Sequence, residues 1–164
     1  MADTTLWSPS HPHTAAEMLT RARNEPAYAA FWLLRVGFVV LPLWMGIDKF
    51  TKVLNADWPG YLAPWIVDLL PFSAQTAMYV VGAIEILAGI MVALKPRYAS
   101  YVVALWLAGI IINLALLGGY WDILMRDVAL FLLALTFARL ARAFPAGATS
   151  DWLASIARHR RLVR

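Results

Sequence analysis

Four apolar runs, each long enough to cross a lipid bilayer as a helix, constrain the fold of this chain more than any other feature. They lie at about 29–47, 73–94, 99–121 and 123–139. A membrane-spanning helix needs about 20 predominantly apolar residues. Hydrophobic residues make up 62% of the chain and charged residues 15%, whereas an average soluble domain is about half apolar and a quarter charged. We therefore predict an all-α fold, an integral membrane four-helix bundle.

The fourth run contains charged residues that cannot all lie outside the membrane. Only 11 uncharged residues separate Asp127 from Arg139, which is about 16 Å of helix, whereas the hydrocarbon core is about 30 Å thick. Arg139 and Arg142 have long side chains that can reach the membrane surface, but the side chain of Asp127 is short. We therefore expect Arg126 and Asp127 to lie inside the bundle, near its outer end.

Polar segments flank the four runs and divide the chain into three parts. Residues 1–28 are predicted to form a cytoplasmic N-terminal tail, 29–143 the transmembrane domain, and 144–164 a basic C-terminal tail. A capping-box spacing of Thr and Glu in the first tail predicts a short helix at about 14–25. In the second tail, an amphipathic helix is predicted to begin near Ser150 and to lie on the membrane surface.

The segment 51–72 is predicted to form a lid on the outer surface of the bundle. It is too long for a tight turn, and its three prolines interrupt it too often for a membrane span. Its aromatic residues Trp58, Tyr61 and Trp65 are of the kind that favours the headgroup layer. Within this segment, 65–70 is predicted to form a short interfacial helix.

Basic residues predict the orientation of the chain in the membrane. With the N-terminus inside, the cytoplasmic segments hold ten Lys and Arg residues and the opposite side holds three, which is the direction of the positive-inside bias. Both termini are therefore expected to be cytoplasmic. Arg35 lies within the first run, where we expect its side chain to reach the headgroups, and Pro42 is expected to bend that helix.

Polar residues within the runs and at their ends form a candidate intramembrane site. They are Lys49, Glu85, Asn113, Arg126 and Asp127. A charge at the centre of the bilayer costs about 3 kcal/mol on insertion scales, so charged groups there are usually paired or functional. Glu85 lies near the middle of the second run, on one helix face with Gly82 and Gly89, where small residues let another backbone approach. We expect its carboxyl group to point into the bundle, either protonated or paired with a cation.

Two interpretations of this site stay open. In the functional interpretation, the polar residues form a small site toward the outer leaflet that binds a quinone head group or relays a proton. In the structural interpretation, the same residues form a network of hydrogen bonds and ion pairs that locks the helices together. The tryptophans are interpreted as interface anchors.

Several classes of protein are disfavoured by residues that the chain lacks. It has no cysteine, and its three histidines, His11, His13 and His159, lie in the tails, so no haem, copper or other metal site is expected. No catalytic triad, phosphate-binding loop or dinucleotide-binding glycine pattern is present. The net charge of +4 reflects a cluster of arginines in the last residues, for which anionic lipid is the expected contact and not nucleic acid.

Four short motifs occur in order along the runs. They are Arg35-Val36-Gly37, Gly46-Ile47-Asp48-Lys49, Gly82-Ala83-Ile84-Glu85 followed by Gly89, and Arg126-Asp127. In their order and in their placement relative to the runs, these motifs resemble the DoxX/DoxD family of small four-helix membrane proteins. The resemblance covers about residues 30–140, and the polar residues that match are Lys49, Glu85, Arg126 and Asp127.

The resemblance implies a membrane subunit associated with a quinone-linked oxidoreductase, without a haem or metal of its own. DoxD proteins are membrane subunits of a thiosulfate:quinone oxidoreductase, so a quinone is the implied ligand, and other membrane protein subunits and the lipid bilayer are the implied partners. Some distant relatives act as assembly factors, and a non-catalytic structural or assembly subunit is therefore the alternative. Whether the chain is itself an enzyme stays open. The resemblance also implies a bacterial inner membrane.

Overall fold

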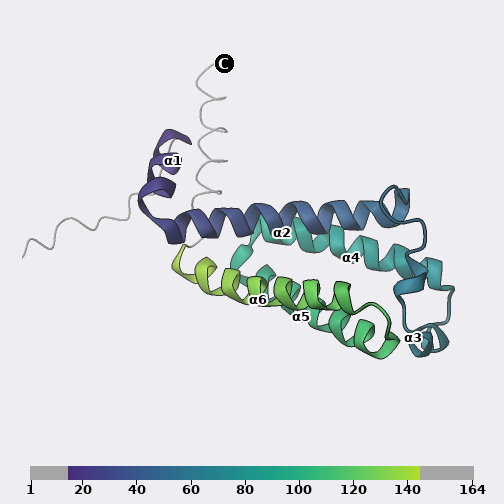
Figure 1. The fold of residues 1–164 in the computed structure, drawn as a ribbon. Helices are drawn as coiled ribbons and strands as arrows, with labels where there is room; N and C mark the ends of the chain where they lie inside the picture. Colours follow the sequence, from purple (N-terminus) through teal and green to yellow (C-terminus); the bar gives the residue numbers. More distant parts are fainter. Residues whose placement is uncertain (1–14, 145–164) are drawn as a thin grey trace, which may run out of the picture.

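The computed structural model describes residues 15–144, and within them the secondary structure is entirely helical. The helices are α1 (Ala15–Asn24), α2 (Pro26–Thr51), α3 (Pro64–Leu69), α4 (Ala74–Leu94), α5 (Pro96–Leu117) and α6 (Trp121–Ala143), with a short 3-10 helix at Pro59–Tyr61. The four long helices, α2, α4, α5 and α6, lie side by side (Figure 1). The end that carries α1 and the connection from α4 to α5 is named here the inner end, and the end that carries α3 the outer end.

Three of the described helices are long and apolar enough to cross a membrane. These are α2, α4 and α5, and many of their large apolar side chains are exposed on the outside of the helix assembly, among them Leu33, Leu87 and Leu105. Water does not favour an apolar surface of this extent. The chain is therefore a membrane protein with three candidate spans, and α6, which carries five Asp and Arg residues, is not among them.

The observed helix limits agree with the predicted runs and extend several of them. The first run becomes a longer helix, which continues through Pro42 up to Thr51. The third run ends earlier than expected, at Leu117, and the fourth begins at Trp121. The helix predicted at 14–25 is present as α1. The capping residue Thr14 and the C-terminal helix predicted near Ser150 lie outside the described residues.

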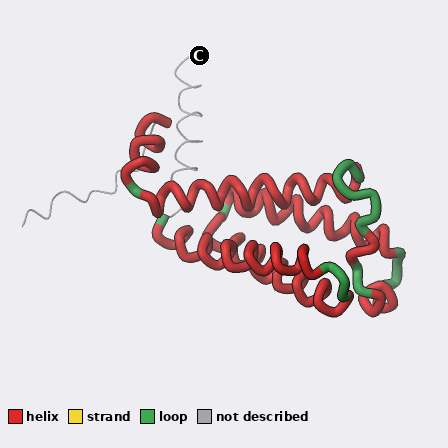
Figure 2. Tube along the Cα trace, viewed as in Figure 1, coloured by secondary structure: helices red, strands yellow, loops and turns green. Residues whose placement is uncertain are grey.

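The connections between the long helices are set by residues suited to helix ends. The Oγ atom of Ser73 accepts a hydrogen bond from the backbone N–H of Thr76 and caps the start of α4. Pro96 opens α5, at a position where its missing N–H has no role. Gly118 and Gly119 end α5 with φ angles of 73° and 83°, a conformation that glycine adopts without a steric penalty. The connections from α2 to α4 and from α5 to α6 both lie at the outer end (Figure 2).

The core changes in character along the helices. Its inner half is apolar and aromatic: the ring of Phe137 in α6 packs against Phe31 and Phe38 in α2, with ring centroids 5.7 and 5.8 Å apart. Small residues such as Ala99 and Ala134 fill the remaining space there. Of the buried charged residues, Asp48, Lys49 and Asp127 lie toward the outer end, Glu85 lies near the middle of α4, and Arg35 lies in the inner half. The fold thus joins a mainly apolar inner core to a more polar outer region.

Glycines bring α2 and α4 into close contact. A methyl group added at Gly46 would lie 2.6 Å from the carbonyl oxygen of Gly82, and one added at Gly82 would lie 2.8 Å from the carbonyl oxygen of Gly46. At Gly89 an added methyl group would meet Leu43 at 2.8 Å. Small residues at such positions allow two helix backbones to pack closely. The close approach expected at Gly82 and Gly89 is therefore present.

This contact predicts that Gly46→Ala destabilises the protein. The added methyl group overlaps a backbone oxygen, and overpacking of this kind costs about 1–3 kcal/mol. Gly109→Ala is the matched control, because no atom lies within 4 Å of the position that its methyl group would occupy. We expect a lower thermal unfolding midpoint in detergent for Gly46→Ala and no decrease for Gly109→Ala. Equal midpoints for the two variants would contradict the glycine contact.

Candidate functional site

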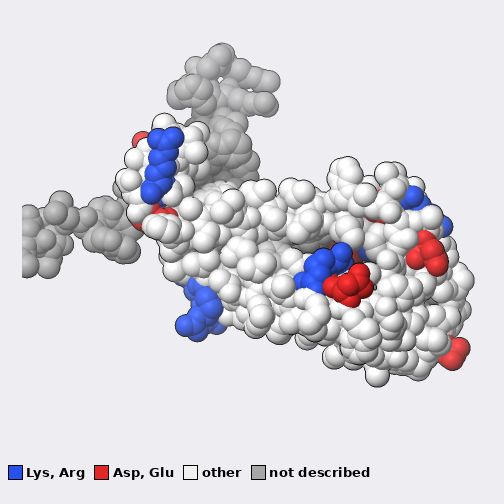
Figure 3. Space-filling model, viewed as in Figure 1, with Lys and Arg blue, Asp and Glu red and all other residues white. Residues whose placement is uncertain are grey.

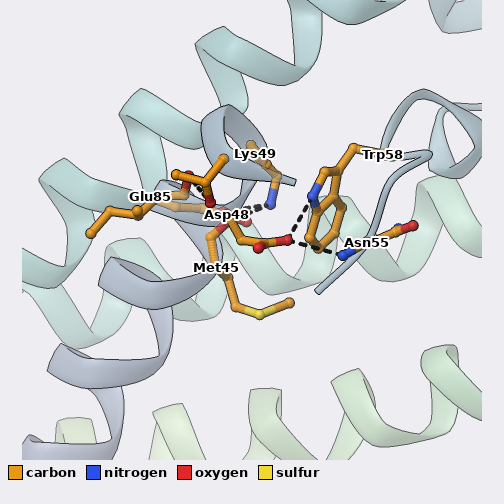
Figure 4. Close-up of polar contacts among 8 residues, drawn as sticks. Met45, Asp48, Lys49, Asn55, Trp58 and Glu85 are labelled. Atoms are coloured by element: carbon orange, nitrogen blue, oxygen red, sulfur yellow. Dashed lines mark hydrogen bonds and ion pairs between the residues drawn. The ribbon is translucent and has the colours of Figure 1, made fainter. Parts of the chain in front are cut away.

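An ion pair between Lys49 of α2 and Glu85 of α4 lies at the centre of the polar region. The Nζ atom of Lys49 is 2.6 Å from Oε2 of Glu85, and both residues are at least nine-tenths buried, at 4% and 9% exposure. Lys49 also donates a hydrogen bond to the carbonyl oxygen of Met45, at 3.5 Å (Figure 4). The structure thus brings together two residues of the predicted site from different helices.

The glycine contact between α2 and α4 makes room for this pair. A methyl group on Gly82 would lie 3.1 Å from the Cβ atom of Lys49, so the stem of the lysine passes over the glycine. Glu85 follows Gly82 by three residues and therefore occupies the same face of α4. In the motif Gly-Ala-Ile-Glu, the glycine leaves space for the backbone of α2 and the acid pairs with the lysine of α2.

Trp58 covers the ion pair from the outer end. The ammonium group of Lys49 lies 4.1 Å from the centroid of the Trp58 ring, a geometry that attracts a cation to the ring face. Trp58 is 9% exposed, so it is not the interface anchor that its position in the lid segment suggested. Its indole N–H donates a 3.0 Å hydrogen bond to the Oδ2 atom of Asp48 (Figure 4).

Asp48 holds the beginning of the lid segment. Its Oδ1 atom accepts hydrogen bonds from the backbone N–H groups of Val53 and Leu54, at 2.9 and 2.8 Å. Its Oδ2 atom accepts from the N–H of Asn55, at 3.2 Å, and from the indole of Trp58. A negative charge near the C-terminus of a helix interacts unfavourably with the helix dipole. The four hydrogen bonds to Asp48 compensate for this unfavourable interaction. The motif Gly46-Ile47-Asp48-Lys49 already included Asp48, but its role in holding the lid segment was not predicted.

Asn113 of α5 holds the middle of the lid segment. Its side-chain oxygen accepts a hydrogen bond from the N–H of Ala63, at 2.9 Å, and its Nδ2 atom donates to the carbonyl oxygen of Tyr61, at 2.6 Å. The ring of Tyr61 also packs against that of Tyr120, with centroids 4.9 Å apart. Asn113 was predicted to belong to one polar site with Glu85, whereas both of these amide hydrogen bonds go to the backbone of the lid segment. A lone polar residue on a helix does not reveal which backbone groups it will bind.

Arg126 and Asp127 of α6 form a second ion pair next to the first. The Nε atom of Arg126 lies 3.2 Å from Oδ1 of Asp127. The side chain of Asp127 is only 8% exposed, whereas that of Arg126 is 58% exposed, so the expectation that both lie inside the bundle is confirmed for Asp127 and wrong for Arg126. Asp127 lies near enough to Glu85 for their charges to interact, and the indole of Trp106 also adjoins Glu85. Two of the three carboxylates in the polar region, Glu85 and Asp127, are therefore each paired with a cation, and the third, Asp48, is held by hydrogen bonds.

Arg35 occupies a different position from the one its sequence context predicted. It is 4% exposed, and its Nη2 atom donates a hydrogen bond to the carbonyl oxygen of Ala93, at 2.5 Å. Its guanidinium group also lies 5.0 Å from the centroid of the Trp32 ring. The expectation that this side chain reaches the headgroups is wrong, because a carbonyl in the last turn of α4 accepts a hydrogen bond from it inside the helix assembly.

The arrangement of the polar region limits its chemistry. It offers an ammonium group, a guanidinium group, three carboxylates and indole N–H groups, which can exchange protons and form hydrogen bonds. Within residues 15–144, no group of three or more His, Cys, Asp or Glu side chains is placed to hold a metal ion.

Comparison of the chain with protein-family models, with curated proteins and with solved structures finds no match.

The buried ion pair predicts strongly coupled effects of two substitutions. Glu85→Leu leaves the Lys49 ammonium buried without a counter-charge, and breaking a buried pair in this way costs about 3–5 kcal/mol. Adding Lys49→Met removes the stranded charge, so the double variant should regain most of the lost stability. Thermal unfolding midpoints of both single variants and the double variant test this coupling. Additive losses would show that the two side chains do not interact.

The two hydrogen bonds of Asn113 predict that Asn113→Leu releases the lid segment from α5. The substitution keeps the volume but removes the acceptor for the Ala63 N–H and the donor to Tyr61. We expect faster hydrogen exchange in a peptide containing Ala63, and unchanged exchange within α4. Thr136→Val is the control, because the Thr136 hydroxyl bonds only within its own exposed helix turn. Unchanged exchange at Ala63 in Asn113→Leu would refute the tether.

Proposed function

We propose that α6 is a fourth membrane crossing, which makes the chain a four-helix transmembrane bundle. Two features of the described residues support this. First, α6 is about as long as α4 and α5 and packs along α5 over much of its length (Figure 1). Second, Asp127, a charge that would oppose a membrane location, is buried and paired with Arg126, which lowers the cost of placing it in lipid.

We further propose that the protein is a membrane subunit of a quinone-linked oxidoreductase complex, as its resemblance to the DoxX/DoxD family implies. The observation that carries this proposal is the buried Lys49–Glu85 pair, with a second acid, Asp127, close by. Reduction of a quinone to a quinol consumes two electrons and two protons. The electrons come from a redox partner subunit and the two protons from water. The carboxylate groups of Glu85 and Asp127 take up these protons and pass them to the quinone, and the ammonium group of Lys49 stabilises negative charge on a quinone oxygen.

The alternative is a non-catalytic subunit that stabilises or assembles a larger membrane complex. It is favoured by the roles of Asp48 and Asn113, which use their polar atoms to hold the lid segment. Under this alternative the Lys49–Glu85 pair also serves only to join α2 and α4. Both proposals place the chain in a bacterial inner membrane with cytoplasmic termini and with other membrane protein subunits as partners, as the family resemblance and the distribution of basic residues imply.

The two functions make different predictions for Glu85→Gln. The amide keeps the shape and part of the hydrogen bonding of the carboxyl group but cannot release a proton. If Glu85 supplies protons, the complex purified from native membranes should keep its composition and lose quinone reduction by about 100-fold, within the usual range for a positioned acid or base. Quinone reduction and subunit composition are measured on the same preparation.

Asp122→Asn is the matched control, because Asp122 is an exposed acid in the first turn of α6. It should leave both the activity and the composition unchanged. Full quinone reduction in Glu85→Gln would refute the redox role of this site. A Glu85→Gln protein that no longer retains its partner subunits would support the structural alternative.

A further inference from the structure

The lid segment closes the polar region at the outer end. Four hydrogen bonds to Asp48 hold its first residues against α2, and two bonds to Asn113 hold its middle against α5. Between these two anchors, the ring of Trp58 lies directly over the ammonium group of Lys49. A molecule approaching along the helix axis from the outer surface would have to displace this ring and break the bonds beneath it.

The flank of the molecule is more open than its end. Figure 3 shows a hollow between α2 and α6, with basic and acidic side chains at its edge and uncharged surface around it. The ring contacts between Phe31 and Phe38 of α2 and Phe137 of α6 join these helices in the inner half. The hollow lies farther toward the outer end, where the charged residues of the core are found.

Arg126 is an exposed basic side chain in the outer half of α6, one of the two helices that border the hollow. It is 58% exposed, although its neighbour Met125 and the next turns of the helix, at Leu132 and Leu133, present apolar side chains to the surroundings. It pairs with the buried Asp127 through Nε, so the rest of its guanidinium group stays toward the outside. Arg126 therefore combines a bond to the buried acid with a charged group at the surface.

A buried donor belongs to the same polar region. The indole N–H of Trp106 is inaccessible to solvent and faces the Glu85 carboxylate, but within the part of the chain that the structure describes it makes no hydrogen bond of suitable distance and angle. A buried polar group that is left unpaired costs about 1–3 kcal/mol, so an acceptor that reached it would be bound favourably. Trp106 adjoins Glu85 and so belongs to the same region as the Lys49 ammonium group.

From these features we propose that the hollow is a side entrance for a lipid-soluble molecule. Its head group enters from the bilayer between α2 and α6, passes Arg126, and accepts hydrogen bonds from the Trp106 indole and the Lys49 ammonium group. The molecule must therefore carry oxygen acceptors on its head and an apolar tail that remains in the lipid. This inference rests on the proposed function, in which a quinone has this chemistry, and it adds the route of entry and Trp106 as a positioning residue.

The test is binding of a decyl-substituted benzoquinone to the full chain in phosphatidylcholine nanodiscs, with empty nanodiscs as the background. Trp106→Phe keeps an aromatic ring but removes the N–H donor, and loss of one hydrogen bond should raise the dissociation constant about three- to tenfold. Trp44→Phe is the matched control, because Trp44 is 57% exposed on α2, and it should bind as the wild type does. Equal unfolding midpoints for the two variants show that both are folded.

The route is tested by the association rate of the same probe with Asn113→Leu, in which the lid segment is released from α5. Entry through the flank predicts an unchanged rate, whereas a faster rate would show entry under the lid and overturn the side entrance. If the wild type binds the probe and Trp106→Phe binds it equally well, the side site is wrong while the quinone-linked function stands. If the wild type binds no more probe than empty nanodiscs, the quinone-linked function fails, and this occupant of the hollow fails with it.

Discussion

The ion pair between Lys49 and Glu85 is the interaction on which the outer half of the structure depends. Its two charges are buried 2.6 Å apart in an assembly whose exterior is largely apolar, where either charge alone would be costly. Their pairing requires α2 and α4 to approach closely, which Gly46 and Gly82 permit. It also requires cover on the outer side, which Trp58 supplies. Helix packing, ion pairing and lid position are therefore parts of one arrangement.

The inner half of the structure is held mainly by aromatic packing, and the outer half mainly by polar contacts. Aromatic contacts of Phe137 with Phe31 and Phe38 join α2 to α6 at the inner end, and Arg35 binds the last turn of α4 nearby. These contacts join the helices at the inner end. The polar contacts of the outer half are therefore not the sole interactions between the helices. Under either proposed function, the surface presented to ligands or partner subunits is set by that outer half.

Helix positions and the orientation of Glu85 could be predicted from the sequence, whereas most polar partners could not. The length of an apolar run and the spacing of glycines are properties of one short stretch of sequence. They therefore predicted α4 and the face of α4 that packs against α2. The partners of Asn113 and Arg35 are backbone groups far along the chain, at Tyr61, Ala63 and Ala93. Any residue type has such groups, so no side-chain pattern marks them. Both Arg35 and Asn113 were consequently given the wrong surroundings.

The most direct test of this account is a distance measurement between the two charged groups in a lipid bilayer. Solid-state NMR of protein with 15N-labelled lysine and 13C-labelled glutamate can detect the dipolar coupling between Lys49 Nζ and Glu85 Cδ, with Lys49→Met used to assign it. We expect a strong coupling that survives in lipid and disappears in that variant. A spectrum in which Lys49→Met removes no coupling would show that the two charges are not paired, and the proposed site would then lack its centre.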